Sequence, residues 1–197
     1  MEVNKLKKVL FVNSCTRSNS RTLFIAKYLL NRFKKCDFEI ETLNLESEGL
    51  LPLGKRTLHM REKFVQDRDF SNLMFEYAKQ WAAADYIVIA APYWDLSFPA
   101  SLKNYIEQIT IPHLTFKYVD DCKIQGLCKC KKLFYVTASS GPIVDLTYGF
   151  GYIKSLCETF YGINDVVLIK ADAMDFPVKK METVLYDVRL AIDQLEI

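Results

Sequence analysis

The feature that most constrains the fold is the stretch at residues 85–91, Asp-Tyr-Ile-Val-Ile-Ala-Ala, which is apolar at every position after the first. It is continuous and rich in β-branched residues, as expected for a strand that is covered on both faces. Strands of this kind belong to parallel sheets, whose connecting helices pack on either side. The run therefore predicts an α/β architecture.

The rest of the chain repeats this alternation of strand-like and helix-like patterns. Further strands are predicted at residues 8–13, 38–45, 133–138 and 165–170. Helices are predicted from apolar residues at helical spacing at residues 20–34, 71–84, 99–109, 148–161 and 178–195. Five strands joined by helices predict a doubly wound five-stranded parallel sheet with strand order 2-1-3-4-5.

Two stretches fall outside the alternation. Residues 46–63 are polar, carry Pro52 and Gly54, and are predicted to form a long loop. Residues 111–131 contain Thr-Phe-Lys-Tyr-Val and then a polar, glycine-containing segment, which predicts a β-hairpin excursion near 114–131. No repeat or linker divides the sequence, and its length suits one domain over residues 1–197.

Composition argues against several classes of protein. The formal net charge of +2 is too small to indicate nucleic-acid or anionic-membrane binding. No segment reaches the roughly 18 consecutive apolar residues of a membrane span. The first 14 residues lack the long apolar core and cleavage site of a signal peptide, so we expect a cytoplasmic protein with reduced thiols.

Three of the six cysteines, Cys122, Cys128 and Cys130, lie within nine residues. Their C-x5-C-x-C spacing differs from the paired C-x2-C of zinc ribbons and from the cysteine runs of ferredoxins. A surface hairpin that carries thiols is therefore the favoured interpretation. A metal or iron–sulfur cluster is the alternative, which iron analysis would test.

In a doubly wound sheet the ligand lies beyond the carboxyl ends of the strands, so the turns there are the candidate site. The first turn, residues 14–22, is rich in hydroxyls and leads into a helix, whose positive end favours a phosphate. It contains no glycine, so neither G-x-x-x-x-G-K-[ST] nor G-x-G-x-x-G is present. A plain helix cap is the alternative interpretation.

The second turn, residues 91–100, carries Tyr93, Trp94 and Phe98 between two prolines that stiffen the backbone. Such a loop can enclose a flat ring, although core packing is the alternative for any single aromatic residue. The third turn, residues 137–142, has small residues that permit close backbone approach to a ligand. Alone it is a weak signal.

Together the three turns resemble those of the flavodoxin-like NAD(P)H:quinone oxidoreductases, most closely the FMN-dependent NADH-azoreductase branch. Four stretches carry the resemblance: Ser-Asn-Ser at 18–20, APYWDLSFPASLKNYIEQI at 91–109, Leu-Thr-Phe-Lys-Tyr at 114–118 and Tyr-Gly-Ile-Asn-Asp-Val at 161–166. They follow the family's order over nearly the whole chain, and 91–109 is the most specific. Residues 46–70 lie outside the resemblance.

The resemblance implies a role for thirteen residues. The FMN phosphate would be held by Ser14, Ser18, Asn19 and Ser20. The isoalloxazine ring would be lined by Tyr93, Trp94, Asp95 and Leu96. The other edge of the ring would be faced by Ser139, Ser140, Gly141 and Pro142. The substrate pocket of a homodimer would be bordered by Phe116.

Two residues depart from the family pattern. Asp95 stands where the family usually has Asn, and a carboxylate near the flavin would disfavour a negatively charged reduced ring. Pro142 replaces a glycine and removes one backbone donor. Both departures bear on the reaction rate and the range of acceptors more than on FMN binding.

The resemblance also implies the reaction. NADH or NADPH would reduce the flavin, and a quinone, azo compound or similar flat acceptor would then replace the nicotinamide in a ping-pong sequence. A flavodoxin-like electron carrier without NAD(P)H turnover and a flavin-free binding module are the alternatives. Flavodoxins tend to be acidic and shorter, whereas this chain is near neutral and carries an additional hairpin.

Overall fold

The computed structural model describes residues 6–176 and 180–197. Its central sheet has five parallel strands in the order β2-β1-β3-β6-β7, which confirms the predicted order of 2-1-3-4-5. These strands are β1 (Lys8–Asn13), β2 (Glu39–Asn44), β3 (Tyr86–Ala90), β6 (Lys132–Ala138) and β7 (Val166–Ala171).

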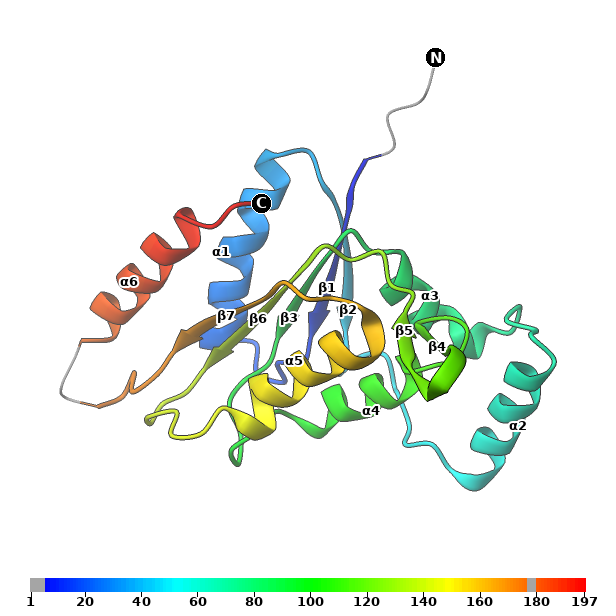
Figure 1. The fold of residues 1–197 in the computed structure, drawn as a ribbon. Helices are drawn as coiled ribbons and strands as arrows, with labels where there is room; N and C mark the ends of the chain where they lie inside the picture. The colour runs from blue at the N-terminus through cyan, green and yellow to red at the C-terminus, as the bar shows by residue number, and fades with distance from the viewer. Residues whose placement is uncertain (1–5, 177–179) are drawn as a thin grey trace, which may run out of the picture.

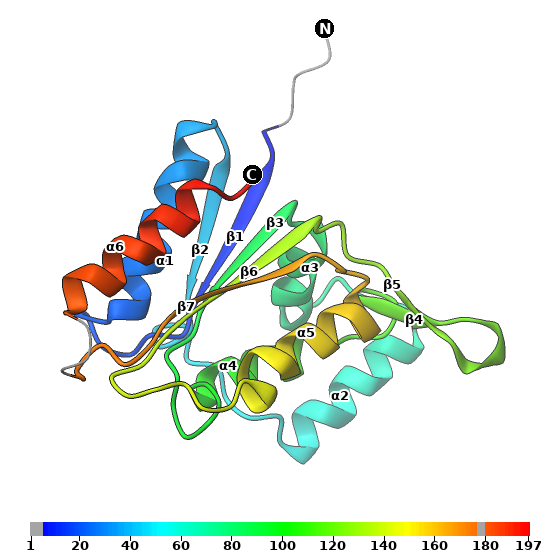
Figure 2. The same ribbon diagram turned by 60° about the vertical axis from the view of Figure 1, so that its left-hand side comes forward.

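Helices cover both faces of the sheet, as Figures 1 and 2 show. One face packs against α1 (Arg21–Lys35) and α6 (Met181–Asp193), and the other against α3 (Glu76–Ala83), α4 (Ala100–Ile109) and α5 (Tyr152–Leu156). All five residues of β3 are buried, as the apolar run predicts. The layered α/β architecture is therefore confirmed.

Two helical predictions need refinement. The helix predicted at residues 148–161 is a short α-helix, α5, between π-helical turns at Thr147–Gly151 and Cys157–Tyr161. The last helix begins at Met181, and residues 177–179 lie outside the described part of the chain. Among the described residues, none of the helices combines the length and apolarity needed to span a membrane.

The loop predicted at residues 46–63 is wrong in its second half, where the structure has α2 (Lys55–Gln66). None of the residues of α2 is buried, and only Phe64 and Val65 pack partly against the core. Pro52 and Gly54 just before the helix favoured the loop prediction. The helix lies at the periphery beside α4 (Figure 1), and the Arg61 guanidinium donates to the Glu107 carbonyl at 2.7 Å.

The predicted β-hairpin is confirmed as an antiparallel pair, β4 (Phe116–Tyr118) and β5 (Ile124–Gly126). It packs closely against the end of the α5 segment. A Cβ added to Gly126 would lie 2.2 Å from the backbone nitrogen of Gly162, a distance that no real contact tolerates. Glycine at position 126 therefore allows the hairpin backbone to reach the segment that precedes β7.

We predict that Gly126→Ala destabilises the protein by about 1–3 kcal/mol or more, because two backbones must separate to admit one methyl group. Urea unfolding at equilibrium measures this change. Gly54→Ala is the matched control, since a Cβ at that position has no neighbour within 4 Å. Equal unfolding midpoints for both variants would show that the close approach is not a constraint.

Candidate functional site

The hydrogen-bond ladder of the sheet continues past the carboxyl ends of the strands into the turns. Three backbone bonds extend it: Ser14 N–H to Ala90 O (3.0 Å), Ala91 N–H to Val136 O (2.9 Å) and Tyr93 N–H to Ala138 O (3.2 Å). These bonds hold the first, second and third turns side by side. The turns predicted to carry the site thus share one edge of the sheet.

A cavity of about 420 Å³ lies between these turns. Its volume falls within the range of about 300–1,000 Å³ typical of small-molecule and cofactor sites. The lining residues are Thr16, Arg17, Asn19, Ser20, Arg21, Thr22, Pro92, Tyr93, Trp94, Ala138, Ser139, Ser140 and Asp175. They come from four loops at the same edge.

The first turn forms an electropositive end of the cavity. Ser20 is the N-cap of α1, and its hydroxyl accepts a hydrogen bond from the Leu23 amide at 3.3 Å. The first turn of α1, which is fully described, contains no acidic side chain. Free amides at a helix start attract an anion, and the guanidinium groups of Arg17 and Arg21 add charge beside them.

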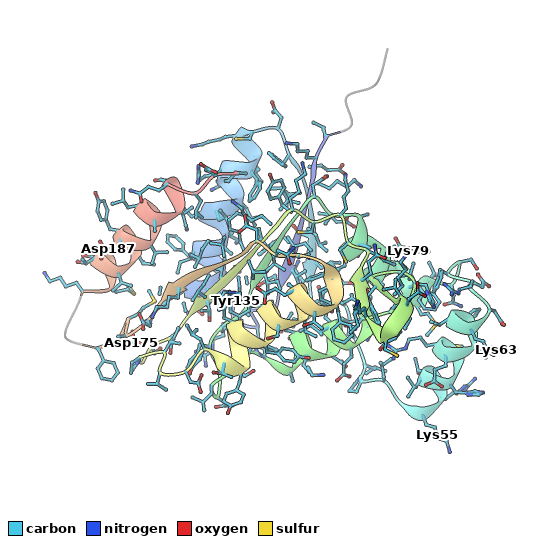
Figure 3. All side chains as sticks on the ribbon, in the orientation of Figure 1. Lys55, Lys63, Lys79, Tyr135, Asp175 and Asp187 are labelled. Atoms are coloured by element: carbon cyan, nitrogen blue, oxygen red, sulfur yellow. The ribbon has the colours of Figure 1, made fainter. Side chains whose placement is uncertain are left out.

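Asp175 contributes a fourth wall that the sequence analysis did not identify. It lies on the loop after β7, and Figure 3 shows it at the end of the sheet away from Lys55 and Lys63 of α2. The Arg21 guanidinium pairs with its carboxylate at 2.5 Å. Hydrogen bonds from Arg21 and Ser140 lower the pKa of Asp175. The sequence signal that could have identified Asp175 is its place in the loop that follows the last parallel strand.

The second turn is a tight hairpin. Trp94 and Ser97 exchange backbone hydrogen bonds of 3.2 Å and 2.7 Å. Asp95 and Leu96, between them, have φ values of +49° and +66°. Aspartate tolerates this left-handed conformation, but for leucine it is strained, as is common at functional sites. Trp94 is 40% exposed at the cavity.

Two side chains connect this hairpin to the segment after the third turn. The Tyr93 hydroxyl donates to the Asp145 carbonyl at 3.0 Å, and the Ser97 hydroxyl donates to the Tyr148 carbonyl at 2.7 Å. In addition, the Asp145 carboxylate accepts from the Thr147 amide at 2.7 Å, which lowers the pKa of that carboxyl group. These bonds tie the second turn to the segment that follows the third turn.

The third turn is anchored to its neighbours through the backbone. The amide of Ser139 donates to the carbonyl of Ala171 at 2.9 Å, and the carbonyl of Gly141 accepts from the amide of Ala173 at 2.9 Å. Ser139 and Ser140 line the cavity. The loop after β7 therefore holds the third turn from its far side.

The structure brings together half of the twelve residues predicted to bind the cofactor. Those that line the cavity are Asn19, Ser20, Tyr93, Trp94, Ser139 and Ser140. Those that lie outside the lining are Ser14, Ser18, Asp95, Leu96, Gly141 and Pro142. The binding roles of all twelve stay predictions.

The outlying residues have identifiable positions. Ser14 is buried and its hydroxyl donates to the Ala90 carbonyl at 2.9 Å, so it joins two strand ends. Ser18 borders an adjacent hollow of about 260 Å³ between the ends of β1 and β2. Phe116 is buried in the hairpin, edge-to-face with Phe160, and lies outside the cavity lining of this chain.

The three cysteines considered as metal ligands differ in burial. Cys122 is exposed, Cys128 is half-buried, and Cys130 is buried in the same core cluster as Cys157. Within residues 6–176 and 180–197, no cluster of three or more histidine, cysteine or acidic side chains is arranged to hold a metal ion. Cys15 is buried beneath the first turn, and burial raises the pKa of its thiol.

Comparison with known proteins places this geometry in context. A family model for the flavodoxin-like fold matches residues 7–194. A protein of Coprothermobacter proteolyticus named FMN-dependent NADH:quinone oxidoreductase is 32% identical, over 96% of this chain and 98% of its own. FMN-dependent NADH:quinone oxidoreductase 2 of Clostridium acetobutylicum is 33% identical, over 91% of this chain and 93% of its own.

Two solved structures share the fold. The azoreductase of Bacillus anthracis str. Sterne superposes with a TM-score of 0.81 at 23% identity, covering 96% of this chain and 100% of that one. The FMN-dependent NADH-azoreductase of Bacillus anthracis str. Ames Ancestor, in complex with FMN, superposes with a TM-score of 0.79 at 22% identity. The match covers 95% of this chain and 97% of that one.

We predict that Arg21→Gln raises the pKa of Asp175 toward the ordinary value of 3.8, because its principal hydrogen-bond donor is removed. Carbon-detected NMR titration of the side-chain carboxyl measures this pKa. Arg56→Gln, on α2, is the control and should leave it unchanged. An unaltered Asp175 pKa in Arg21→Gln would contradict the pairing.

Proposed function

The chain belongs to the flavodoxin-like fold family, and from this premise we propose that it is an FMN-dependent NAD(P)H oxidoreductase that reduces quinones, azo compounds or similar flat acceptors. The observation that carries the proposal is the cavity at the carboxyl edge of the sheet, electropositive at one end and flanked by aromatic side chains at another. The names of the relatives that cover the chain support it.

The electropositive end suits the FMN phosphate. Arg17 and Arg21 would neutralise its charge, and the side chains of Asn19 and Ser20 lie in the same wall. Backbone amides at the start of α1 would donate to the phosphate oxygens. Arg21 is shared with Asp175, so the carboxylate also fixes the direction of the guanidinium group.

The aromatic side suits the isoalloxazine ring. Tyr93 and Trp94 would flank it, and Ser139 and Ser140 offer polar groups from the facing turn. Asp95 and Leu96 occupy the tip of the hairpin. Because aspartate and asparagine both tolerate the left-handed conformation, the departure at Asp95 preserves the turn while adding a negative charge.

Bound FMN supplies hydride acceptance from a reduced nicotinamide and electron delivery to a flat acceptor, in two half-reactions of a ping-pong sequence. The chain itself would bind and orient the reactants. Among the described residues, the cavity lining holds no histidine, lysine or cysteine, its carboxylate Asp175 pairs with Arg21, and the Tyr93 hydroxyl donates to the Asp145 carbonyl. Hydride transfer through the flavin requires no dedicated acid or base, so these residues would act through position and charge.

We further propose that the enzyme is a cytoplasmic homodimer. Large apolar side chains are exposed on the loops that form or adjoin the cavity: Trp94, Leu96, Val144, Tyr148 and Phe176. Such a cluster supports a partner that covers it. Phe116 would then border the substrate pocket across the interface. The free cysteines support a reducing compartment.

The first test of this proposal is turnover. Protein purified with FMN should lose its yellow colour when NADH or NADPH is added without oxygen, and a soluble quinone should restore it. Steady-state plots at several quinone concentrations should give parallel lines. An FMN-loaded protein that neither nucleotide bleaches would indicate an electron carrier, and a protein that takes up no FMN would contradict the proposal entirely.

The second prediction separates the two ends of the site. Arg21→Gln should weaken FMN binding about 10- to 100-fold, the effect of losing a charged hydrogen bond. The affinity for riboflavin, which lacks the phosphate, should differ by less than about twofold between Arg21→Gln and the unaltered protein. Fluorescence titration measures both affinities, with Arg56→Gln as the control. Equal losses for the two ligands would place the phosphate elsewhere.

A further inference from the structure

Tyr93 makes two separate hydrogen bonds to the chain on either side of the third turn. Its amide donates to the carbonyl of Ala138, at the end of β6, and its hydroxyl donates to the carbonyl of Asp145. These two acceptors lie on either side of the third turn in sequence. One residue of the second turn is therefore bonded to the chain both before and after Ser139–Pro142.

The segment that receives the phenol has little regular structure to hold it. Residues 141–146, all within the described part of the chain, run without helix or strand before the π-helical turn begins at Thr147. Val144 is 74% exposed, whereas Ile143 and Leu146 are half-buried, so burial fixes this segment only in part. Individual hydrogen bonds therefore contribute to its position.

The hairpin on the other side is rigid enough to serve as the anchor. Trp94 and Ser97 close it with two backbone bonds, and Ser97 adds a hydrogen bond from its hydroxyl to the carbonyl of Tyr148. Gly149 is adjacent to Ser97, because a Cβ at Gly149 would lie 3.8 Å from the Ser97 Cα, an ordinary van der Waals distance. The phenol of Tyr93 and the hydroxyl of Ser97 thus hold the same segment at two points.

We propose that Tyr93 is a positioning residue whose hydroxyl ties the 93–97 hairpin to the segment after the third turn and so sets the separation of the second and third turns at the ring end of the site. The proposal rests on the proposed function for the identity of the ligand, and on the hydrogen bonds alone for the tie. Because the phenol donates its hydrogen bond to the backbone carbonyl of Asp145, it acts on the cofactor by positioning the turns and not as a donor to the ring.

The position of the Tyr93–Asp145 hydrogen bond determines whether its loss affects the ring end or the phosphate end of FMN. Tyr93 and Asp145 belong to the second turn and to the segment after the third, whereas the electropositive end is formed by the start of α1. Loss of the hydroxyl should weaken FMN and riboflavin by the same factor, about 2- to 10-fold, the usual effect of one neutral hydrogen bond. Loss of a phosphate contact would instead discriminate between them.

The test uses the full-length protein and the variant Tyr93→Phe, which keeps the ring and removes one oxygen. Tyr28→Phe is the matched control, since the Tyr28 hydroxyl donates to Asp193 at 2.9 Å between α1 and α6, outside the cavity lining. Hydrogen exchange without ligand should show faster exchange in residues 143–151 of Tyr93→Phe only. The visible circular dichroism of bound FMN, which reports ring environment, should change in the same variant only.

Ser97→Ala supplies the second variant. If both hydroxyls hold one segment, the double variant should lose more FMN affinity than the product of the two single losses. Unchanged exchange and unchanged flavin affinity in Tyr93→Phe would overturn the proposal, as would a loss confined to FMN. If unaltered protein binds neither flavin, the proposed function fails, whereas the exchange experiment still decides whether the tie exists.

Discussion

The structure depends on the parallel pairing of β1, β3 and β6 and on the continuation of that pairing into the turns. Parallel strands must end at the same edge, so the chain's three site-forming turns meet there whatever their separation in sequence. The bonds from Ser14 to Ala90 and from Tyr93 to Ala138 extend the ladder beyond the last strand residues. These bonds hold the turns side by side, so that a cavity forms between them at this edge.

Each wall then acquires its chemistry from local features. The absence of acidic residues from the first turn of α1, with Arg17 and Arg21 beside it, makes one end suited to a phosphate. The left-handed pair Asp95 and Leu96 closes a hairpin that presents Trp94. The same physical arrangement therefore supports the proposed anion site at one end of the cavity and the proposed aromatic site at the other.

Sequence patterns predicted the sheet because buried parallel strands such as residues 86–90 are unmistakably apolar. They did not predict α2, which follows Pro52 and Gly54 and buries none of its residues fully. The first, second and third turns were identified from topology, but Asp175 was missed because it meets Arg21 across 154 positions. Ser14 shows the converse limit, since a hydroxyl at a strand end can bond a neighbouring strand and lie outside the cavity.

The most direct test of the central claim is to map FMN binding by backbone NMR. Addition of FMN to the isotopically labelled protein should shift amide resonances in residues 14–22, 92–98 and 138–147 together, along with Asp175 and its neighbours. Resonances of α2, which contributes no residue to the cavity lining, should move little. Shifts centred on α2, with the three turns unaffected, would contradict the account.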